Sequence, residues 1–278
     1  MAFADLLRIP VIGCYAMGSL GLILGLFSRW RVCRKPATWC IAVGFCLHTF
    51  LVLALFLGLN LPQMTKGIFL QGMAWSLVLV YCVTWWRLRF SLLGVFAGPL
   101  ALFLFLLSGD VASISAGLPE KQTAAFFLFH TVVLSLNFSL ITLGFGSALF
   151  FLSVHKKLKT KSLAPAFDSA SPALTTIDRV NAFVVLAGFP LFTLGLLTGF
   201  AGAYLTRGHA LSGDPKEIAS ILVWLAYAYG FIQRAVFGAQ GKKAARMLLF
   251  LFAITLCSLL GVNFFMDSHH NFFRTRLF

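Results

Sequence analysis

The chain has 278 residues, of which 60% are hydrophobic and only 11% are charged, and its mean hydropathy is +0.92. These values exclude an ordinary soluble domain, in which about a quarter of the residues are charged. The net charge of +14 would suit a nucleic-acid-binding protein. Its distribution excludes that class, because most basic residues lie in short segments between long apolar runs.

The apolar runs predict the fold class. They are long enough to cross about 30 Å of hydrocarbon as helices, and they are too continuous for the alternating strands of a membrane barrel. We expect an all-α polytopic membrane protein, a bundle of about eight transmembrane helices that forms a single domain over residues 1–278. The predicted helices lie at about 9–27, 39–59, 68–86, 90–107, 123–154, 182–205, 217–235 and 245–266. Glycines four residues apart, among them Gly195 and Gly199, indicate close packing of helices.

The basic residues predict the orientation of the bundle. If the N-terminus lies outside, the loops after the first, third, fifth and seventh helices are cytoplasmic, and these loops carry most of the 22 basic residues. Lysine and arginine gather in cytoplasmic loops, so both termini are expected on the outer, periplasmic side. Basic clusters beside a membrane also contact anionic lipids, and the lipid bilayer is therefore an expected partner.

The six histidines are the side chains best suited to chemistry, and the predicted topology separates them. His155 ends the fifth helix on the cytoplasmic side and is interpreted as an interfacial basic residue. His48 lies near the middle of the second helix, where a polar side chain requires a partner. Two interpretations of His48 stay open: a hydrogen bond between helices, or a ligand or relay inside the membrane.

Four histidines fall on the outer side, around a polar loop at residues 207–217. His130 lies near the outer end of the fifth helix, His209 lies in the loop, and His269 and His270 follow the eighth helix. Neutral imidazoles in such a group can ligate a metal or haem iron; the alternative is that they simply lie at the membrane interface. No Cys-x-x-Cys-His motif occurs, so covalent attachment of haem to this chain is not predicted. No catalytic residue is assigned.

The polar loop also holds two of the eight acidic residues, Asp214 and Glu217. Asp214 as the N-cap, Pro215 at the first helical position and Glu217 three residues after the cap predict the start of the seventh helix. Carboxylates there also face the positive end of the helix dipole. The first role expected of the acidic pair is therefore architectural.

Several motifs resemble, in order and spacing, those of the CcsA/CcmC/CcmF family of haem-handling proteins in cytochrome c assembly. They are Ile-Asp-Arg-Val-Asn at 177–181, the segment 188–199 that begins Gly-Phe-Pro, Asp-Pro-Lys-Glu at 214–217, Trp-Leu-Ala-Tyr at 224–227, Gly-Lys-Lys-Ala-Ala at 241–245 and Gly-Val-Asn at 261–263. His130 is similar to the family's first outer histidine, and the spacing from the last motif favours His270 over His269 as the second. His48, with Trp75 on the third helix, resembles the family's early transmembrane part.

The resemblance implies a function and a site. In the family, the two outer histidines are axial ligands of haem, a membrane-buried histidine marks an earlier haem position, and reduced haem is presented to the thiols of an apocytochrome. For this chain it implies a cytochrome c biogenesis protein of a bacterial inner membrane. The chain would bind haem b non-covalently through His130 and His270 and would work with a CcsB-type partner and apocytochrome c. The implied haem-binding set is completed by His48, His209, Asp214 and Glu217.

The polar loop departs from the family pattern. The family's outer loop has the form Trp-Gly-x-x-Trp-x-Trp-Asp, and its tryptophans form an aromatic shelf for haem. Counting back from Asp214, these tryptophans fall on Gly213, Leu211 and Arg207, so the shelf is damaged or replaced. His209 and Arg207 are then candidates for contacts with haem propionates. The loop and the chain length also resemble HemX-like relatives, which are associated with haem biosynthesis and the level of glutamyl-tRNA reductase. A HemX-like membrane regulator without ligase activity is therefore the alternative function.

Overall fold

The computed structural model describes residues 2–58, 66–110, 121–160 and 173–265. These residues form eight long α-helices and two short 3-10 helices, and no strand occurs among them. The long helices are α1 (Ala2–Leu24), α2 (Arg34–Gly58), α3 (Lys66–Leu88), α4 (Gly94–Asp110), α5 (Lys121–Lys159), α6 (Leu174–Arg207), α7 (Pro215–Ala235) and α8 (Gly241–Phe265), and the 3-10 helices are η1 (Ser28–Cys33) and η3 (Ser91–Leu93). The predicted all-α fold is confirmed.

Helix length and composition make the chain a multi-pass membrane protein. Within the described residues, the seven helices α1 to α7 are long and apolar enough to cross a membrane. Large apolar side chains on their outer faces are exposed, for example Trp39, Phe50 and Phe103. Contiguous apolar patches of this kind are rare on soluble proteins, whereas in a bilayer they face hydrocarbon. The placement of the termini relative to the membrane stays a prediction.

Several helices extend further than the apolar runs predict, and the extensions of α5 and α6 have a physical cause. α6 begins at Leu174 rather than near residue 182. The early start is stabilised by Asp178, whose side chain binds groups of α7 and α8. α5 ends at Lys159 rather than near residue 154, and three lysines lie in its last turn. Their positive charges interact favourably with the negative end of the helix dipole, so the helix continues past its apolar part.

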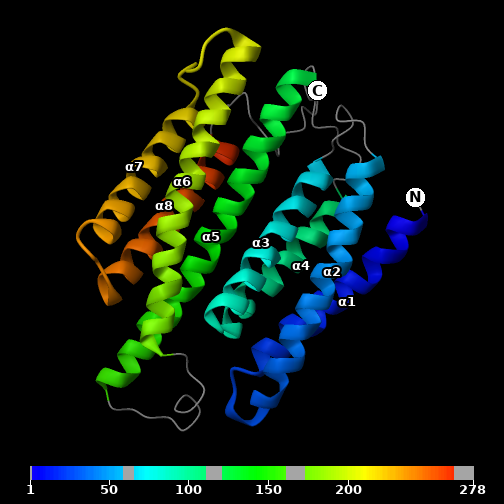
Figure 1. Cartoon of the computed structure of the whole chain (residues 1–278), viewed down its shortest axis with the longest axis vertical. Helices are drawn as coiled ribbons and strands as arrows, with labels where there is room; N and C mark the ends of the chain where they lie inside the picture. Colours follow the sequence, from blue (N-terminus) through cyan, green and yellow to red (C-terminus); the bar gives the residue numbers. More distant parts are fainter. Residues whose placement is uncertain (1, 59–65, 111–120, 161–172, 266–278) are drawn as a thin grey trace.

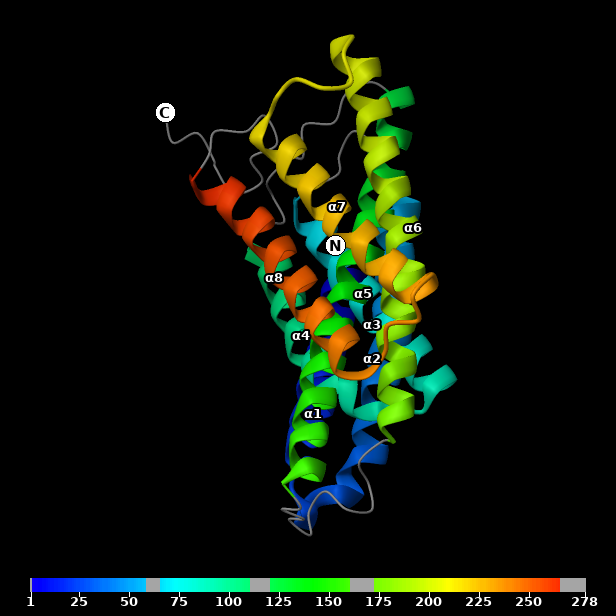
Figure 2. The same cartoon turned by 90° about the vertical axis from the view of Figure 1, so that its left-hand side faces the viewer.

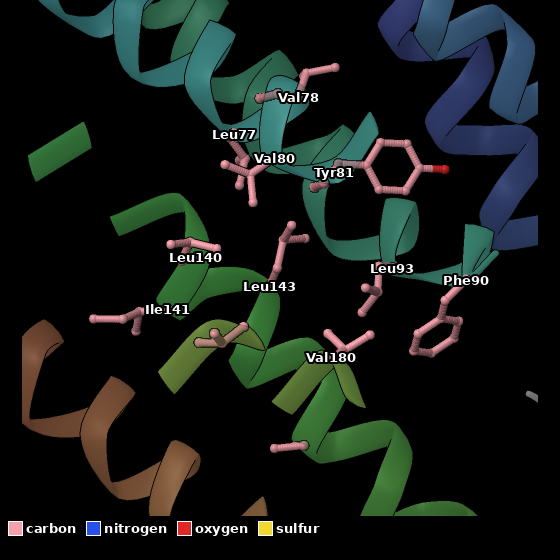
Figure 3. Packing of buried hydrophobic residues seen from close by; sticks show 14 of the residues in the cluster. Leu77, Val78, Val80, Tyr81, Phe90, Leu93, Leu140, Ile141, Leu143 and Val180 are labelled. Carbon is pink, nitrogen blue, oxygen red and sulfur yellow. The ribbon is translucent and has the colours of Figure 1, made fainter. Parts of the chain in front are cut away.

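The helices run roughly side by side along the long axis of the molecule (Figure 1). In this view α1 to α4 lie on one side and α5 to α8 on the other, and α3 packs against α5 where the two groups meet. Figure 3 shows this contact, in which Leu77 and Val80 of α3 face Leu140 and Leu143 of α5. All four side chains are buried. Because lipid tails are as apolar as leucine, close van der Waals packing is the main force that joins the two groups.

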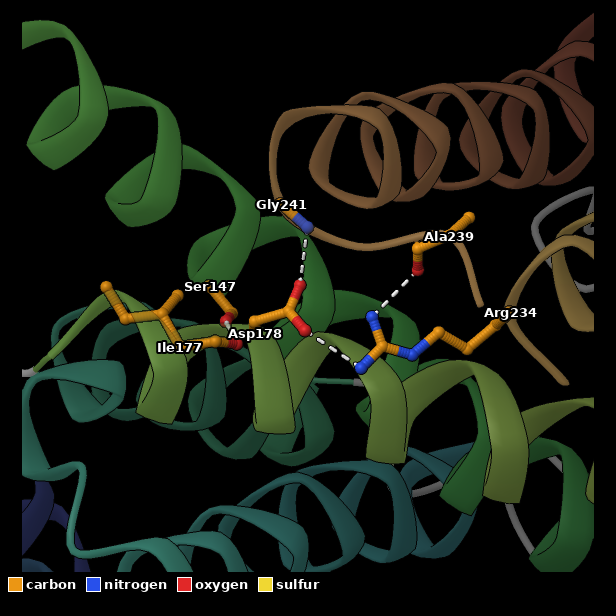
Figure 4. A network of polar contacts seen from close by, with 6 residues as sticks. All are labelled: Ser147, Ile177, Asp178, Arg234, Ala239 and Gly241. Atoms are coloured by element: carbon orange, nitrogen blue, oxygen red, sulfur yellow. Dashed lines mark hydrogen bonds and ion pairs between the residues drawn. The ribbon is translucent and has the colours of Figure 1, made fainter. Parts of the chain in front are cut away.

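At one end of the bundle a polar network ties α6 to α7 and α8 (Figure 4). Asp178 of α6 forms an ion pair with Arg234 of α7, with 2.8 Å between Oδ2 and Nη2. The other carboxylate oxygen, Oδ1, accepts a hydrogen bond of 2.8 Å from the backbone N–H of Gly241, the first residue of α8. Arg234 also donates to the carbonyl oxygen of Ala239. Both charged side chains are only 14% exposed, so salt in the solvent screens the pair only weakly.

Asp178→Ala is expected to lower the free energy of unfolding by about 2–3 kcal/mol, because it removes the carboxylate that neutralises Arg234 and the acceptor of the Gly241 N–H. The thermal unfolding midpoint of the detergent-purified protein measures the effect. Arg179→Ala is the matched control, since it removes the charge of the next residue, which is exposed. Equal midpoints for the two variants would contradict a stabilising role for the network.

Candidate functional site

His130 lies in the third turn of α5, at the end of the bundle opposite the Asp178 network. Its Nδ1 atom is 2.7 Å from the carbonyl oxygen of Gly195 in α6. A carbonyl oxygen only accepts, so Nδ1 carries the proton and donates, which leaves the lone pair of the neutral ring on Nε2. The half-buried imidazole is therefore held in one tautomer, with Nε2 suited to ligate a metal.

Two glycines of α6 make room for this contact. A Cβ atom on Gly199 would lie 2.8 Å from Cε1 and 3.0 Å from Nδ1 of His130. A Cβ atom on Gly195 would lie 2.5 Å from Cδ2 of Leu134, one turn further along α5. A larger residue at position 195 would press on Leu134, and one at position 199 would displace the imidazole and break or lengthen its hydrogen bond. The close packing that the glycine spacing predicts is confirmed at this contact.

The loop between α6 and α7 lies at the same end of the bundle (Figure 2). Asp214 is the N-cap of α7, and its side chain accepts a hydrogen bond of 2.8 Å from the backbone N–H of Lys216. The predicted helix start is therefore confirmed. The Glu217 carboxylate is buried and accepts from the backbone N–H and the hydroxyl of Ser212, at 2.7 and 2.9 Å. Both carboxylates thus shape the loop, as the architectural interpretation predicts.

The start of α7 lies at the same end of the bundle as the start of α5, which carries His130 (Figure 2). The positive charge of Lys216, in the first turn of α7, interacts electrostatically with His130 there. His209 is exposed in the loop and forms no hydrogen bond with the residues that the structure describes. His269 and His270 lie outside the described residues, so the pairing of His270 with His130 stays a prediction. The last described turn of α8 does lie towards the end of the bundle where α5 begins (Figures 1 and 2).

His48 of α2 is completely buried. Its Nδ1 atom lies 3.0 Å from the hydroxyl oxygen of Tyr15 in α1, so the predicted hydrogen bond between helices is present. The ring of Phe105 in α4 packs edge-on against the imidazole, with 4.7 Å between the centroids. The Nε2 atom is buried and has no hydrogen-bond partner among the described residues. The second interpretation, a ligand or relay, therefore stays open, although a large ligand would reach this atom only after the surrounding rings moved.

α6 carries the segment 188–199, and this segment contacts both neighbouring helices. Gly188 leaves space for Tyr227 of α7, because a Cβ atom there would overlap the phenolic oxygen. Thr193 accepts a hydrogen bond of 3.0 Å from Nε1 of Trp224, also in α7. The two glycines further along the segment face α5 and His130. One helix thus connects the polar network at one end with His130 at the other, and motifs far apart in the sequence meet along it.

These features define a helical multi-pass membrane protein that presents an oriented imidazole at one end of its bundle. Within that class, the chain belongs to the cytochrome c assembly protein family, whose model matches residues 20–270. The match spans most of the chain and includes the early helices as well as the C-terminal motifs. The family resemblance inferred from the motifs is confirmed.

The relatives of the chain include cytochrome c biogenesis proteins named CcsA. The protein from Porphyra purpurea is 25% identical over an alignment of 305 positions, which covers 91% of this chain and 94% of that protein. The protein from Microcystis aeruginosa is 26% identical over 253 positions, covering 72% of this chain and 75% of that protein. The protein from Chlamydomonas reinhardtii is 26% identical over 211 positions, covering 73% of this chain and 58% of that protein. In this last alignment the chain spans little more than half of its relative.

Proposed function

We propose that this chain serves the maturation of c-type cytochromes by binding haem b non-covalently at the outer end of its bundle. The observation that carries the proposal is the hydrogen bond between Nδ1 of His130 and the Gly195 carbonyl, which directs the lone pair to Nε2. Haem iron takes neutral imidazole as an axial ligand, and a hydrogen bond at the other ring nitrogen makes the imidazole a stronger ligand. His270 is the proposed second axial ligand.

The surroundings of His130 suit an apolar macrocycle with acidic side chains. Phe126 lies one turn earlier on the same face of α5 and is 40% exposed. It lies beside Gly202 of α6, as His130 lies beside Gly199. An aromatic face packs favourably on a conjugated ring, and the nearby charge of Lys216 suits a propionate group. Phe126 and Lys216 therefore supply part of the haem contact that the tryptophan shelf supplies in other members of the family.

In this proposal the residues of the chain bind and orient, and haem supplies the vinyl groups to which the thiols of an apocytochrome c become attached. His130 sets the position at the outer end, and the contact between α5 and α6 covers one edge of its ring. His209 is exposed in the loop between α6 and α7, where it can contact the solvent-facing groups of a bound haem. Asp214 and Glu217 contribute indirectly, because their hydrogen bonds hold the conformation of the loop between α6 and α7. A CcsB-type partner, apocytochrome c and a bacterial inner membrane complete the proposed setting.

His48 is the proposed earlier haem position inside the membrane. Its buried Nε2 atom lacks a hydrogen-bond partner among the described residues, and leaving such an atom unpaired carries a cost of about 1–3 kcal/mol. A ligand bond would remove that cost. Tyr15 holds the opposite ring nitrogen, as a supporting group does at many metal sites.

A HemX-like regulator of haem biosynthesis is the second candidate function. One observation favours it: positions 211 and 213 of the loop hold an exposed leucine and an exposed glycine where the family has tryptophans. A protein of this kind would change the level of glutamyl-tRNA reductase and would leave the attachment of haem to apocytochromes unaffected.

Deletion of the gene tests the two functions against each other. We expect the strain to lose c-type cytochromes, seen as haem-stained bands of membrane proteins, and we expect the wild-type gene to restore them. His130→Ala should fail to restore them at equal membrane abundance, while Thr131→Ala, which changes the adjacent residue, should succeed. Normal c-type cytochromes in the deletion strain, with altered tetrapyrrole levels, would contradict the first function and support the regulator.

A further inference from the structure

A pocket of about 290 Å³ lies between the end of α5 and the start of α8, at the end of the bundle opposite His130. Its lining residues are Leu152, His155, Lys156, Lys159 and Thr160 of α5, with Lys242 and Arg246 of α8. In each helix these residues recur every three or four positions and so share one face. Two basic helix faces therefore meet across a space many times the roughly 10–15 Å³ that one water molecule requires.

The positive charges of this basic pocket are not neutralised by the described part of the chain. No acidic residue lines it there, and its lysine and arginine side chains have no ion pair with the described residues. Asp178 contacts Gly241, the residue before Lys242, but its two oxygens accept from Gly241 and Arg234. Like charges gathered in one pocket favour a bound anion.

The lining of the basic pocket continues into an exposed apolar strip on α8. Phe250 follows Arg246 by one turn and is 64% exposed. Ala253 and Cys257 follow on the same face and are also exposed. A molecule with a phosphate group and an attached hydrocarbon chain can occupy the pocket and the strip together, whereas a soluble anion contacts only the pocket. Anionic phospholipids have this form.

We propose that the basic pocket binds the phosphate-bearing head group of an anionic phospholipid, with an acyl chain along Phe250 and the α8 strip. The predicted orientation places this end of the bundle at the cytoplasmic leaflet, where anionic lipids attract basic side chains. A bound phosphate bridges the ends of α5 and α8 and reduces the repulsion between their charges. The site lies far from His130 and does not depend on haem.

Native mass spectrometry of the full-length protein, purified in detergent, tests this site. Phosphatidylglycerol or phosphatidylcholine is added, and the fraction of lipid-bound protein is measured against lipid concentration. We expect wild type to prefer phosphatidylglycerol, and the double variant Lys242→Gln with Arg246→Gln to bind it about tenfold more weakly or worse. The matched control, Arg29→Gln with Lys35→Gln, removes two exposed charges elsewhere on the chain and should retain wild-type affinity.

Two further arms separate a lipid from a soluble phosphate. Inorganic pyrophosphate is added as a competitor, and Phe250→Ala shortens the apolar strip. The lipid assignment expects weak competition by pyrophosphate and weaker phosphatidylglycerol binding by Phe250→Ala. Full displacement by equimolar pyrophosphate with no effect of Phe250→Ala would assign the pocket to a soluble anion and overturn the proposal. Equal losses in the pocket variant and the control variant, or no lipid preference in wild type, would also overturn it.

Discussion

Gly188→Ala is expected to lower the free energy of unfolding by about 2–4 kcal/mol, although alanine is the better helix former by about 1 kcal/mol. The added Cβ atom would overlap the phenolic oxygen of Tyr227, a fully buried residue. The ring must move, which strains a packed interior and breaks the hydrogen bond of 3.2 Å from the Tyr227 hydroxyl to the Val184 carbonyl. A buried hydroxyl without its acceptor costs a further 1–3 kcal/mol or so.

The thermal unfolding midpoint in detergent measures this loss, and Gly72→Ala is the matched control. A Cβ atom on Gly72, inside α3, would have no atom within 4 Å, so this variant should be as stable as wild type or slightly more stable. Adding Tyr227→Phe to Gly188→Ala should recover part of the loss, because the overlapping oxygen is removed. A Gly188→Ala protein that is as stable as the Gly72→Ala protein would show that α6 and α7 do not pack as described.

Gly199→Ala is expected to weaken haem binding by about 10- to 100-fold, the usual effect of losing a group that orients a metal ligand. The new Cβ atom would lie 2.8 Å from Cε1 and 3.0 Å from Nδ1 of His130. The half-buried ring can turn away, so we expect little loss of stability. It would then lose its hydrogen bond to the Gly195 carbonyl, and Nε2 would no longer be held in place. Haem titration of the purified protein, followed by absorbance, measures the affinity.

Gly202→Ala is the control for this prediction. It adds the same methyl group one turn further along α6, where the nearest atom would be Cβ of Phe126 at an ordinary 3.9 Å. Haem affinity should stay close to that of wild type. If Gly199→Ala binds haem as tightly as Gly202→Ala, the contact between His130 and α6 has no role in ligation.

Much of the fold could be predicted from the sequence, because hydropathy alone decides which segments cross a membrane. The eight helices appear where the apolar runs predict them. The early start of α6 could not be predicted in this way, since it depends on Asp178 finding Arg234 and Gly241 more than 50 residues later in the chain. The start of α7 could be predicted, because an N-cap and its proline are local signals that act within one turn.

The candidate site could be predicted only in part. Topology and the family resemblance indicate His130 as a ligand. Its hydrogen bond is to the backbone carbonyl of Gly195, and a sequence does not show which carbonyl a side chain reaches. The partner of His48 is Tyr15, a residue without a motif. The glycine spacing in α6 predicts close packing of helices, but it does not show that His130 is the neighbour.

The basic pocket illustrates the same limit. The sequence indicates an interfacial role for His155 of α5, and the lysines after it indicate only the orientation of the bundle. The structure places this helix end beside Lys242 and Arg246, which lie about 90 residues later. The basic residues at the end of α5 and at the start of α8 form a pocket only because these two helices pack side by side.

The absorption spectrum of the detergent-purified protein tests the central claim, haem ligation by His130 and His270, most directly. We predict that wild-type protein from haem-replete cells shows a Soret band, that His130→Ala and His270→Ala each lose or strongly shift it, and that Thr131→Ala keeps it. A colourless wild-type preparation, or a Soret band that is unchanged in both histidine variants, would contradict the account.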